Sequence, residues 1–202
     1  MSHLISRPHI IDIAKLQPLA HRSRGKITKL YLHWTAGRYE QVFDDYHISI
    51  GKTGTIYLTC SELSELKAHT WHRNTGSIGI ALCCAYLASC RRNGNATPLI
   101  DFGPYGPTQE QIETMSKVIA VITQELGLDI NEDTVLTHQE AANQDGYGPG
   151  DGDPDMRWDL WYLPDRPQTI QLKPGGLVLR GKALWYRAKQ LTGNREQLTV
   201  NR

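Results

Sequence analysis

Hydrophobic and polar positions alternate over a short stretch from Ile27 to His33, which reads Ile-Thr-Lys-Leu-Tyr-Leu-His. A period of two is typical of a β-strand. Two further short runs, 46–50 and 55–59, flank the sequence Gly-Lys-Thr-Gly and predict a hairpin. The run from Ser77 to Tyr86 is almost continuously apolar, which indicates a central strand covered on both faces.

The period changes after Thr108. Thr108 and Gln111 have the spacing of a capping box, and Gly127 is placed to end a helix. Between them, apolar residues recur at helical spacing: Ile112, Met115, Val118, Ile119 and Ile122. We therefore predict a long helix over this segment.

The remaining elements are shorter. Helices are predicted around Ile10 to Leu16 and around Ala183 to Leu191, and residues 128–137 predict a strand that ends at His138. Residues 143–152 are rich in Gly, Asp, Asn and Pro, which predicts a loop. Strands interleaved with helices indicate an α/β fold, with a mixed central β-sheet flanked by helices.

Length and composition favour one domain, because 202 residues with 40% hydrophobic residues can bury one substantial core. We expect an N-terminal arm over residues 1–25, a catalytic domain over 26–164, and a basic helical C-terminal extension over 165–202. The formal net charge is only +1, but residues 173–202 contain seven Lys or Arg and a single acid, Glu196. This tail either associates with an anionic envelope surface or is a solvated helix beside the domain. It carries no nucleic-acid recognition motif, so no nucleic-acid partner is expected.

The four cysteines form no C-x-x-C pair, and Cys83 and Cys84 are adjacent. This pattern favours reduced, packed thiols, with a disulfide between Cys60 and Cys90 as the alternative. The N-terminus lacks the basic and apolar segments of a secretory signal, and no apolar run approaches the about 18 residues of a membrane span. We therefore expect synthesis in the cytoplasm without a signal peptide, and no membrane span.

The candidate chemistry lies in three residues far apart in sequence: His33, His138 and Asp153. Two imidazoles and a carboxylate can hold one zinc ion while leaving a fourth position open for water, as hydrolytic zinc sites do. Asp151 and Asp155, two residues to either side of Asp153, are alternative third ligands.

Five motifs occur in order along the chain. They are Leu-His-Trp-Thr-Ala-Gly at 32–37, Tyr-His with a Gly-Thr turn at 46–55, His-Thr-Trp-His-Arg-Asn with Ser-Ile-Gly-Ile at 69–80, Gly-Pro-Thr-Gln-Glu-Gln-Ile at 106–112, and His-Gln-Glu at 138–140 followed by Asp153-Pro and Trp158-Asp159. Together they resemble the zinc-dependent N-acetylmuramoyl-L-alanine amidases that share the peptidoglycan recognition protein fold, above all the small bacteriophage lysozyme-type amidases. The resemblance covers roughly residues 26–164.

The resemblance implies a peptidoglycan hydrolase that uses zinc-activated water to cleave the amide between N-acetylmuramic acid and L-alanine. It also implies that His33, His138 and Asp153 are the zinc ligands, with Asp153 preferred because Asp159 follows six residues later. Tyr46 matches a tyrosine that lies beside the zinc and stabilises the oxyanion.

The sequence departs from this family in two places. Many relatives carry a general-base glutamate directly after Ser-Ile-Gly-Ile, where this chain has Ala81. The phage-type branch also lacks it. A lysine usually stands two residues before the third ligand, where this chain has Asp151. Asp151 is then a general base or a solvated loop residue, and Arg157 is an alternative source of the missing cation.

Other residues match the loop that lines the substrate groove in these amidases. His69, Trp71 and Asn74, together with Arg157, are expected to bind the muramyl peptide, and the alternative is simple loop packing. His47 is expected to be structural, and Glu140 to orient a ligand or cap a turn.

Two other functions remain open. One is a non-catalytic peptidoglycan-binding protein of the same fold, and the other is a zinc endopeptidase or carboxypeptidase acting within the stem peptide. The expected setting is a phage endolysin or virion lysin, or a secreted effector with an immunity protein as partner. Recycling of wall fragments is less favoured because position 81 is alanine. An endolysin or effector would be bacteriolytic and antimicrobial, acting on peptidoglycan in the periplasm after release or delivery.

Overall fold

The computed structural model describes residues 3–91, 98–148, 157–164 and 171–200, the last ten as backbone only. Its centre is a six-stranded sheet in the order β1-β4-β3-β5-β2-β8. The bounds are β1 His9–Ile11, β2 Lys29–Trp34, β3 Ile48–Ile50, β4 Ile56–Leu58, β5 Ser77–Leu82 and β8 Val135–Thr137. Strands β3, β5, β2 and β8 run parallel, whereas β4 and β1 are antiparallel to their neighbours. This mixed sheet with helical cover is an α/β fold, as predicted.

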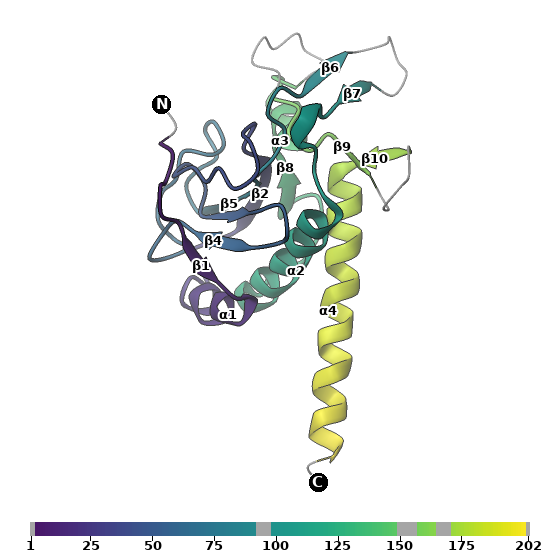
Figure 1. Cartoon of the computed structure of the whole chain (residues 1–202). Helices are drawn as coiled ribbons and strands as arrows, with labels where there is room; N and C mark the ends of the chain where they lie inside the picture. The colour runs from purple at the N-terminus through teal and green to yellow at the C-terminus, as the bar shows by residue number, and fades with distance from the viewer. Residues whose placement is uncertain (1–2, 92–97, 149–156, 165–170, 201–202) are drawn as a thin grey trace.

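Three helices cover one face of this sheet: α1 Ile13–Arg22, α2 Gln109–Leu126 and α4 Gly175–Val200. Figure 1 shows α2 and α4 side by side, with the end of α4 extending beyond the body. The core joins the inward faces of β2, β3 and β5 to apolar residues of these helices, among them Leu16, Ile112, Met115 and Leu179. No helix in the described part of the chain is both long enough and apolar enough to cross a bilayer.

Smaller elements lie at the edge of the sheet where β2 and β8 end. Helix α3, His138–Gln144, follows β8 directly. Two hairpins pair β6 Ser89–Arg91 with β7 Leu99–Asp101, and β9 Tyr162–Pro164 with β10 Leu172–Pro174. A short 3-10 helix spans Gly103–Tyr105, and β10 leads directly into α4.

The long predicted helix is confirmed in detail. Thr108 and Gln111 form the capping box of α2, and Gly127 ends the helix at φ 73°. The hairpin and the central strand are also present, and every residue of β5 is buried.

Three predictions of local structure were wrong in their bounds. The first helix starts later and runs to Arg22, because Asp12 caps it by accepting from the Lys15 amide, and the preceding residues pair with β4 as β1. The strand predicted over 128–137 is confined to its last three residues, and His138, which follows it, begins α3, whose last two residues fall in the predicted loop. The C-terminal helix begins at Gly175 instead of near Ala183.

The alternative of a Cys60–Cys90 disulfide is not realised, because Cys60 carries a free thiol. Cys83 and Cys84, the two residues that follow β5, are buried.

Candidate metal centre

The carboxyl edge of the parallel strands brings two histidines together. His33 is the penultimate residue of β2, and His138 follows the neighbouring strand β8 as the first residue of α3. Their ring centroids are 4.7 Å apart. Ligand sites commonly lie at this edge of a parallel sheet, because successive strands deliver their last side chains to the same place.

A carboxylate completes the group. Asp159 Oδ2 lies 3.4 Å from His33 Nδ1 and 3.2 Å from His138 Nδ1. One ligand atom from each of the three residues lies within 4.8 Å of the others, and this is the only such group among the described residues. His33 is fully buried, whereas His138 and Asp159 keep 18% and 19% of their side-chain surface exposed, so the site has an open side.

The protonation of His33 follows from a chain of hydrogen bonds behind it. The Ser77 hydroxyl has two carbonyl acceptors, Arg73 O at 2.7 Å and Asn74 O at 2.9 Å, so its proton is directed to a carbonyl. Ser77 Oγ therefore accepts from His69 Nε2, 3.4 Å away. Because a neutral imidazole carries one proton, His69 Nδ1 is then an acceptor.

Thr70 links this chain to the site. Its hydroxyl lies 2.9 Å from His69 Nδ1 and donates to it. The same oxygen lies 3.2 Å from His33 Nε2 and accepts from it. In neutral His33 the lone pair is consequently on Nδ1, which is the nitrogen that faces His138 and Asp159.

The electrostatics agree with neutral imidazoles at His33 and His69 and an ionised carboxylate at Asp159. Burial lowers the pKa of His33 to about 4 and that of His69 to about 2. Burial alone would raise the pKa of Asp159, but the neighbouring histidines, His138 above all, bring it below its ordinary value. The lone pair of His33 Nδ1, a ring nitrogen of His138 and an anionic oxygen of Asp159 thus lie within 4.8 Å of one another. This donor set fits a zinc ion.

The predicted third ligand, Asp153, lies outside the described residues, as do Asp151 and Asp155. Their roles stay predictions. The sequence motif uses Asp159 only to align Asp153, and it does not predict Asp159 as a ligand. The sequence feature that indicates Asp159 is the tryptophan directly before it. Trp158 packs against Trp34 of β2, with ring centroids 4.7 Å apart, which brings the next residue to the end of that strand.

Tyr46 lies beside His33. Its ring centroid is 5.2 Å from that of His33, and its hydroxyl donates to Trp34 O at 3.4 Å. Burial, reinforced by the charge of Asp159, raises the pKa of Tyr46, so the phenol keeps its proton. Ala81 is the parallel-register partner of His33 on β5, so the position of the family's glutamate adjoins the site and carries no carboxylate.

The predicted groove residues occupy different environments. His69 is buried, with its ring against Gly79, and belongs to the chain behind His33. Asn74 Oδ1 accepts from the Thr70 amide at 2.8 Å, which fixes the loop. Trp71 is 62% exposed, and Arg157 lies over the ring of Tyr147.

His47 and Glu140 hold structural positions. His47 Nδ1 accepts from the Gly79 amide at 3.0 Å, and its Nε2 donates to Glu65 O at 2.8 Å, so neither nitrogen is left for a ligand. Glu140 and Thr137 form the capping box of α3. Glu140 also pairs with Arg180 of α4, a buried contact that the sequence analysis missed because Arg180 was assigned to the basic tail.

The mixed sheet and the group of two histidines and a carboxylate beside it place the chain among α/β proteins with a candidate metal site. Residues 23–151 match the family model Amidase_2, described as N-acetylmuramoyl-L-alanine amidase. The match covers well over half of the chain, which therefore belongs to this family. No curated protein matches the chain.

Proposed function

We propose that the protein is a zinc-dependent peptidoglycan amidase that cleaves the bond between N-acetylmuramic acid and L-alanine. The observation that carries this proposal is the convergence of His33 Nδ1, His138 Nδ1 and Asp159 Oδ2 at the open edge of the sheet. Membership of the amidase family supports the proposed scissile bond, and the two histidines with a carboxylate support zinc as the metal.

His33 and His138 would hold the zinc together with a carboxylate. Asp159 is the carboxylate beside them in the structure, and Asp153 is the one that the sequence motif favours. When bound, zinc supplies a Lewis acid that polarises the scissile carbonyl and acidifies water.

The protein's own groups would position the substrate and stabilise charge. Tyr46 remains protonated, so its hydroxyl can donate to an oxyanion that develops beside His33. The exposed ring of Trp71, on the same loop as Thr70, offers an apolar surface to a sugar or peptide, and we assign Asn74 and Arg157 to the same groove. Asp151 and Arg157 are the candidates for the proton carrier and the cation near the third ligand.

The test is digestion of purified peptidoglycan with mass analysis of the soluble products. An amidase releases intact stem peptides. Release of shorter peptides would instead indicate an endopeptidase or carboxypeptidase, and binding without release would indicate a non-catalytic peptidoglycan-binding protein.

A second measurement separates the two candidate carboxylates. Zinc content is determined for the wild type, His33→Ala, Asp159→Asn and Asp153→Asn. Loss of zinc in Asp159→Asn alone assigns that residue, loss in Asp153→Asn alone assigns the motif residue, and loss in both means that both coordinate. Full zinc content in His33→Ala would refute the site.

A further inference from the structure

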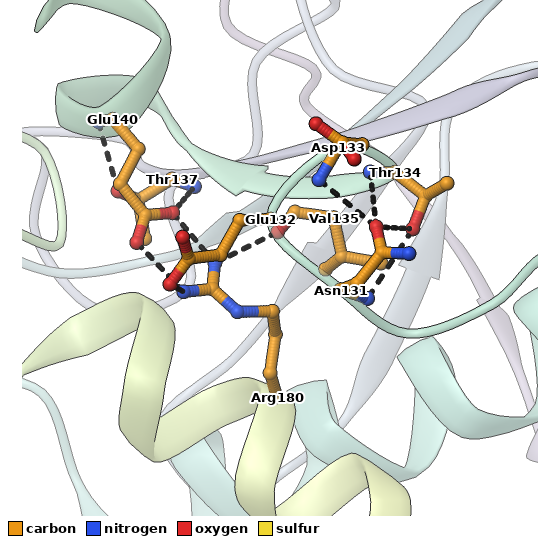
Figure 2. A network of polar contacts seen from close by, with 8 residues as sticks. All are labelled: Asn131, Glu132, Asp133, Thr134, Val135, Thr137, Glu140 and Arg180. Atoms are coloured by element: carbon orange, nitrogen blue, oxygen red, sulfur yellow. Dashed lines mark hydrogen bonds and ion pairs between the residues drawn. The ribbon is translucent and has the colours of Figure 1, made fainter.

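Helix α4 carries a buried arginine, Arg180, whose side chain contacts the segment next to the candidate metal centre. Arg180 is only 7% exposed, and its guanidinium donates to both oxygens of Glu140, at 2.7 Å from Nη1 and 2.9 Å from Nη2. Nη1 also donates to Val135 O of β8 at 2.9 Å. Figure 2 shows this two-pronged contact between α4 and the junction of β8 and α3, with Glu132 as a second acidic residue beside Arg180.

The partner carboxylate in turn holds the backbone that carries His138. Glu140 Oε2 accepts from the Thr137 amide at 2.9 Å, and the Thr137 hydroxyl accepts from the Glu140 amide at 3.2 Å. This reciprocal pair forms the first turn of α3, of which His138 is the first residue. Arg180 therefore fixes the carboxylate that fixes this turn.

The start of α4 also touches the segment that carries Asp159. The Gly175 amide donates to Trp161 O at 2.9 Å. A Cβ at Gly175 would overlap the carbonyl oxygen of Leu160, which directly follows Asp159. A Cβ at Gly176 would overlap the Glu140 carboxylate. Two adjacent glycines thus let one helix end approach both ligand-bearing segments closely.

We propose that Arg180 is a positioning residue of the metal centre and that α4 sets the separation between His138 and Asp159. The helix lies outside residues 23–151, which match the family. In this chain, then, the C-terminal extension is part of the site's framework. The inference rests on the proposed function in one respect, namely that the site binds a divalent cation such as zinc.

A buried ion pair with several hydrogen bonds is better suited to orienting a side chain than to adding stability to the fold. The desolvation of two charges offsets much of their attraction, but the fork geometry of arginine fixes the direction of the carboxylate. Removal of one partner would leave a buried charge without compensation, so single neutral variants could fail to fold. The test therefore uses variants that avoid a lone buried charge.

Three variants of the full chain are compared with the wild type. Arg180→Lys keeps the charge and loses the fork, the double variant Arg180→Gln/Glu140→Gln removes both charges, and Gly176→Ala pushes against Glu140. Two controls lie on the same helix. Gly181→Ala adds a methyl group to open space, and Arg187→Gln removes a donor to Leu128 O, a carbonyl just beyond the end of α2.

Zinc affinity is measured by competition with a chromogenic chelator, and the thermal midpoint is measured on the metal-free proteins. We expect the three variants to bind zinc about 10-fold more weakly, the lower end of the effect of losing an outer-shell partner. Both controls should bind like the wild type, even where Arg187→Gln lowers the midpoint.

Two outcomes overturn the inference in distinguishable ways. If the three variants lower the thermal midpoint but bind zinc like the wild type, the network supports only the fold. If the wild type itself binds no zinc, the proposed metal site fails and the inference fails with it.

Discussion

The hydroxyl of Thr70 lies 3.2 Å from Nε2 of His33, on a loop 37 residues away in sequence. Because the same hydroxyl donates to His69, it can only accept from His33, and this leaves Nδ1 of His33 as the lone-pair nitrogen. A loop residue that touches no metal ligand atom thereby selects the tautomer of a strand residue.

This relationship predicts that Thr70→Val weakens zinc binding. The substitution keeps the side chain's shape but removes the acceptor for His33 Nε2–H, so His33 loses its preference for the tautomer with Nδ1 free. We expect a loss of about 10- to 100-fold in zinc affinity, as for other outer-shell partners of metal-ligating histidines. Chelator competition measures the affinity, and the histidine ¹⁵N chemical shifts of the metal-free protein report the tautomer directly.

Thr70→Ser is the matched control, because it retains the hydroxyl. Thr70→Ser should keep the zinc affinity and the histidine ¹⁵N chemical shifts of the wild type. Equal zinc affinity in Thr70→Val and the wild type would show that the hydroxyl does not set the state of His33.

Tyr46→Phe should separate catalysis from metal binding. Among the described residues, the Tyr46 hydroxyl makes one long hydrogen bond, to Trp34 O, so it is available to a substrate oxyanion at small cost. Its removal should lower kcat by about 100-fold, as the loss of one oxyanion donor does in other hydrolases. Zinc affinity should not change, because burial keeps the phenol protonated and zinc takes its protein ligands from Cys, His, Asp and Glu side chains. Release of stem peptides from purified peptidoglycan gives the rate, and unaltered kcat would remove Tyr46 from the mechanism.

The elements that could be predicted are those whose signals are local. The capping box at Thr108 and the left-handed Gly127 delimit α2 within the chain segment itself. The bounds of α1 could not be obtained in this way. They depend on the pairing of His9–Ile11 with β4, a contact with residues almost 50 positions away.

The same distinction applies to the site. His33 and His138 each lie in a motif of their own, so their residue type and context indicate a ligand. Thr70 and Arg180 matter only through partners 37 and 40 residues distant, and no local pattern distinguishes Arg180 from the other basic residues of the tail. The Arg180 contacts depend on the packing of α4 beside β8 and α3, and the Thr70 contact depends on the approach of its loop to β2; short-range periodicity encodes neither.

The thiols at the end of β5 should resist alkylation in the native protein. Cys83 and Cys84 are fully buried, and burial raises the pKa of Cys83 to about 12 and that of Cys84 well above its ordinary value. At pH 8 a thiol with such a pKa is ionised in only about one molecule in 10,000, and the thiolate is the reactive form. Iodoacetamide followed by mass spectrometry should modify both residues in urea and leave them unmodified without it. Rapid native labelling would mean that this end of the strand opens readily.

Arg73 and Asp145 join the loop of Thr70 to the end of α3 through two short hydrogen bonds, 2.8 Å from Nε and 2.7 Å from Nη2. The Arg73 hydrogen bonds lower the pKa of Asp145 below its ordinary value. The stabilisation is therefore complete above the pKa of the unfolded chain, about 3.9, and is lost as the pH falls through the lower pKa of the folded protein. We expect the wild type to exceed Asp145→Asn in unfolding free energy at pH 6 by about 0.5–1 kcal/mol, because the pair is partly exposed. That difference should shrink in urea titrations at pH 4 and again at pH 3. A difference that stays constant over this range would show that the ion pair makes no pH-linked contribution to stability.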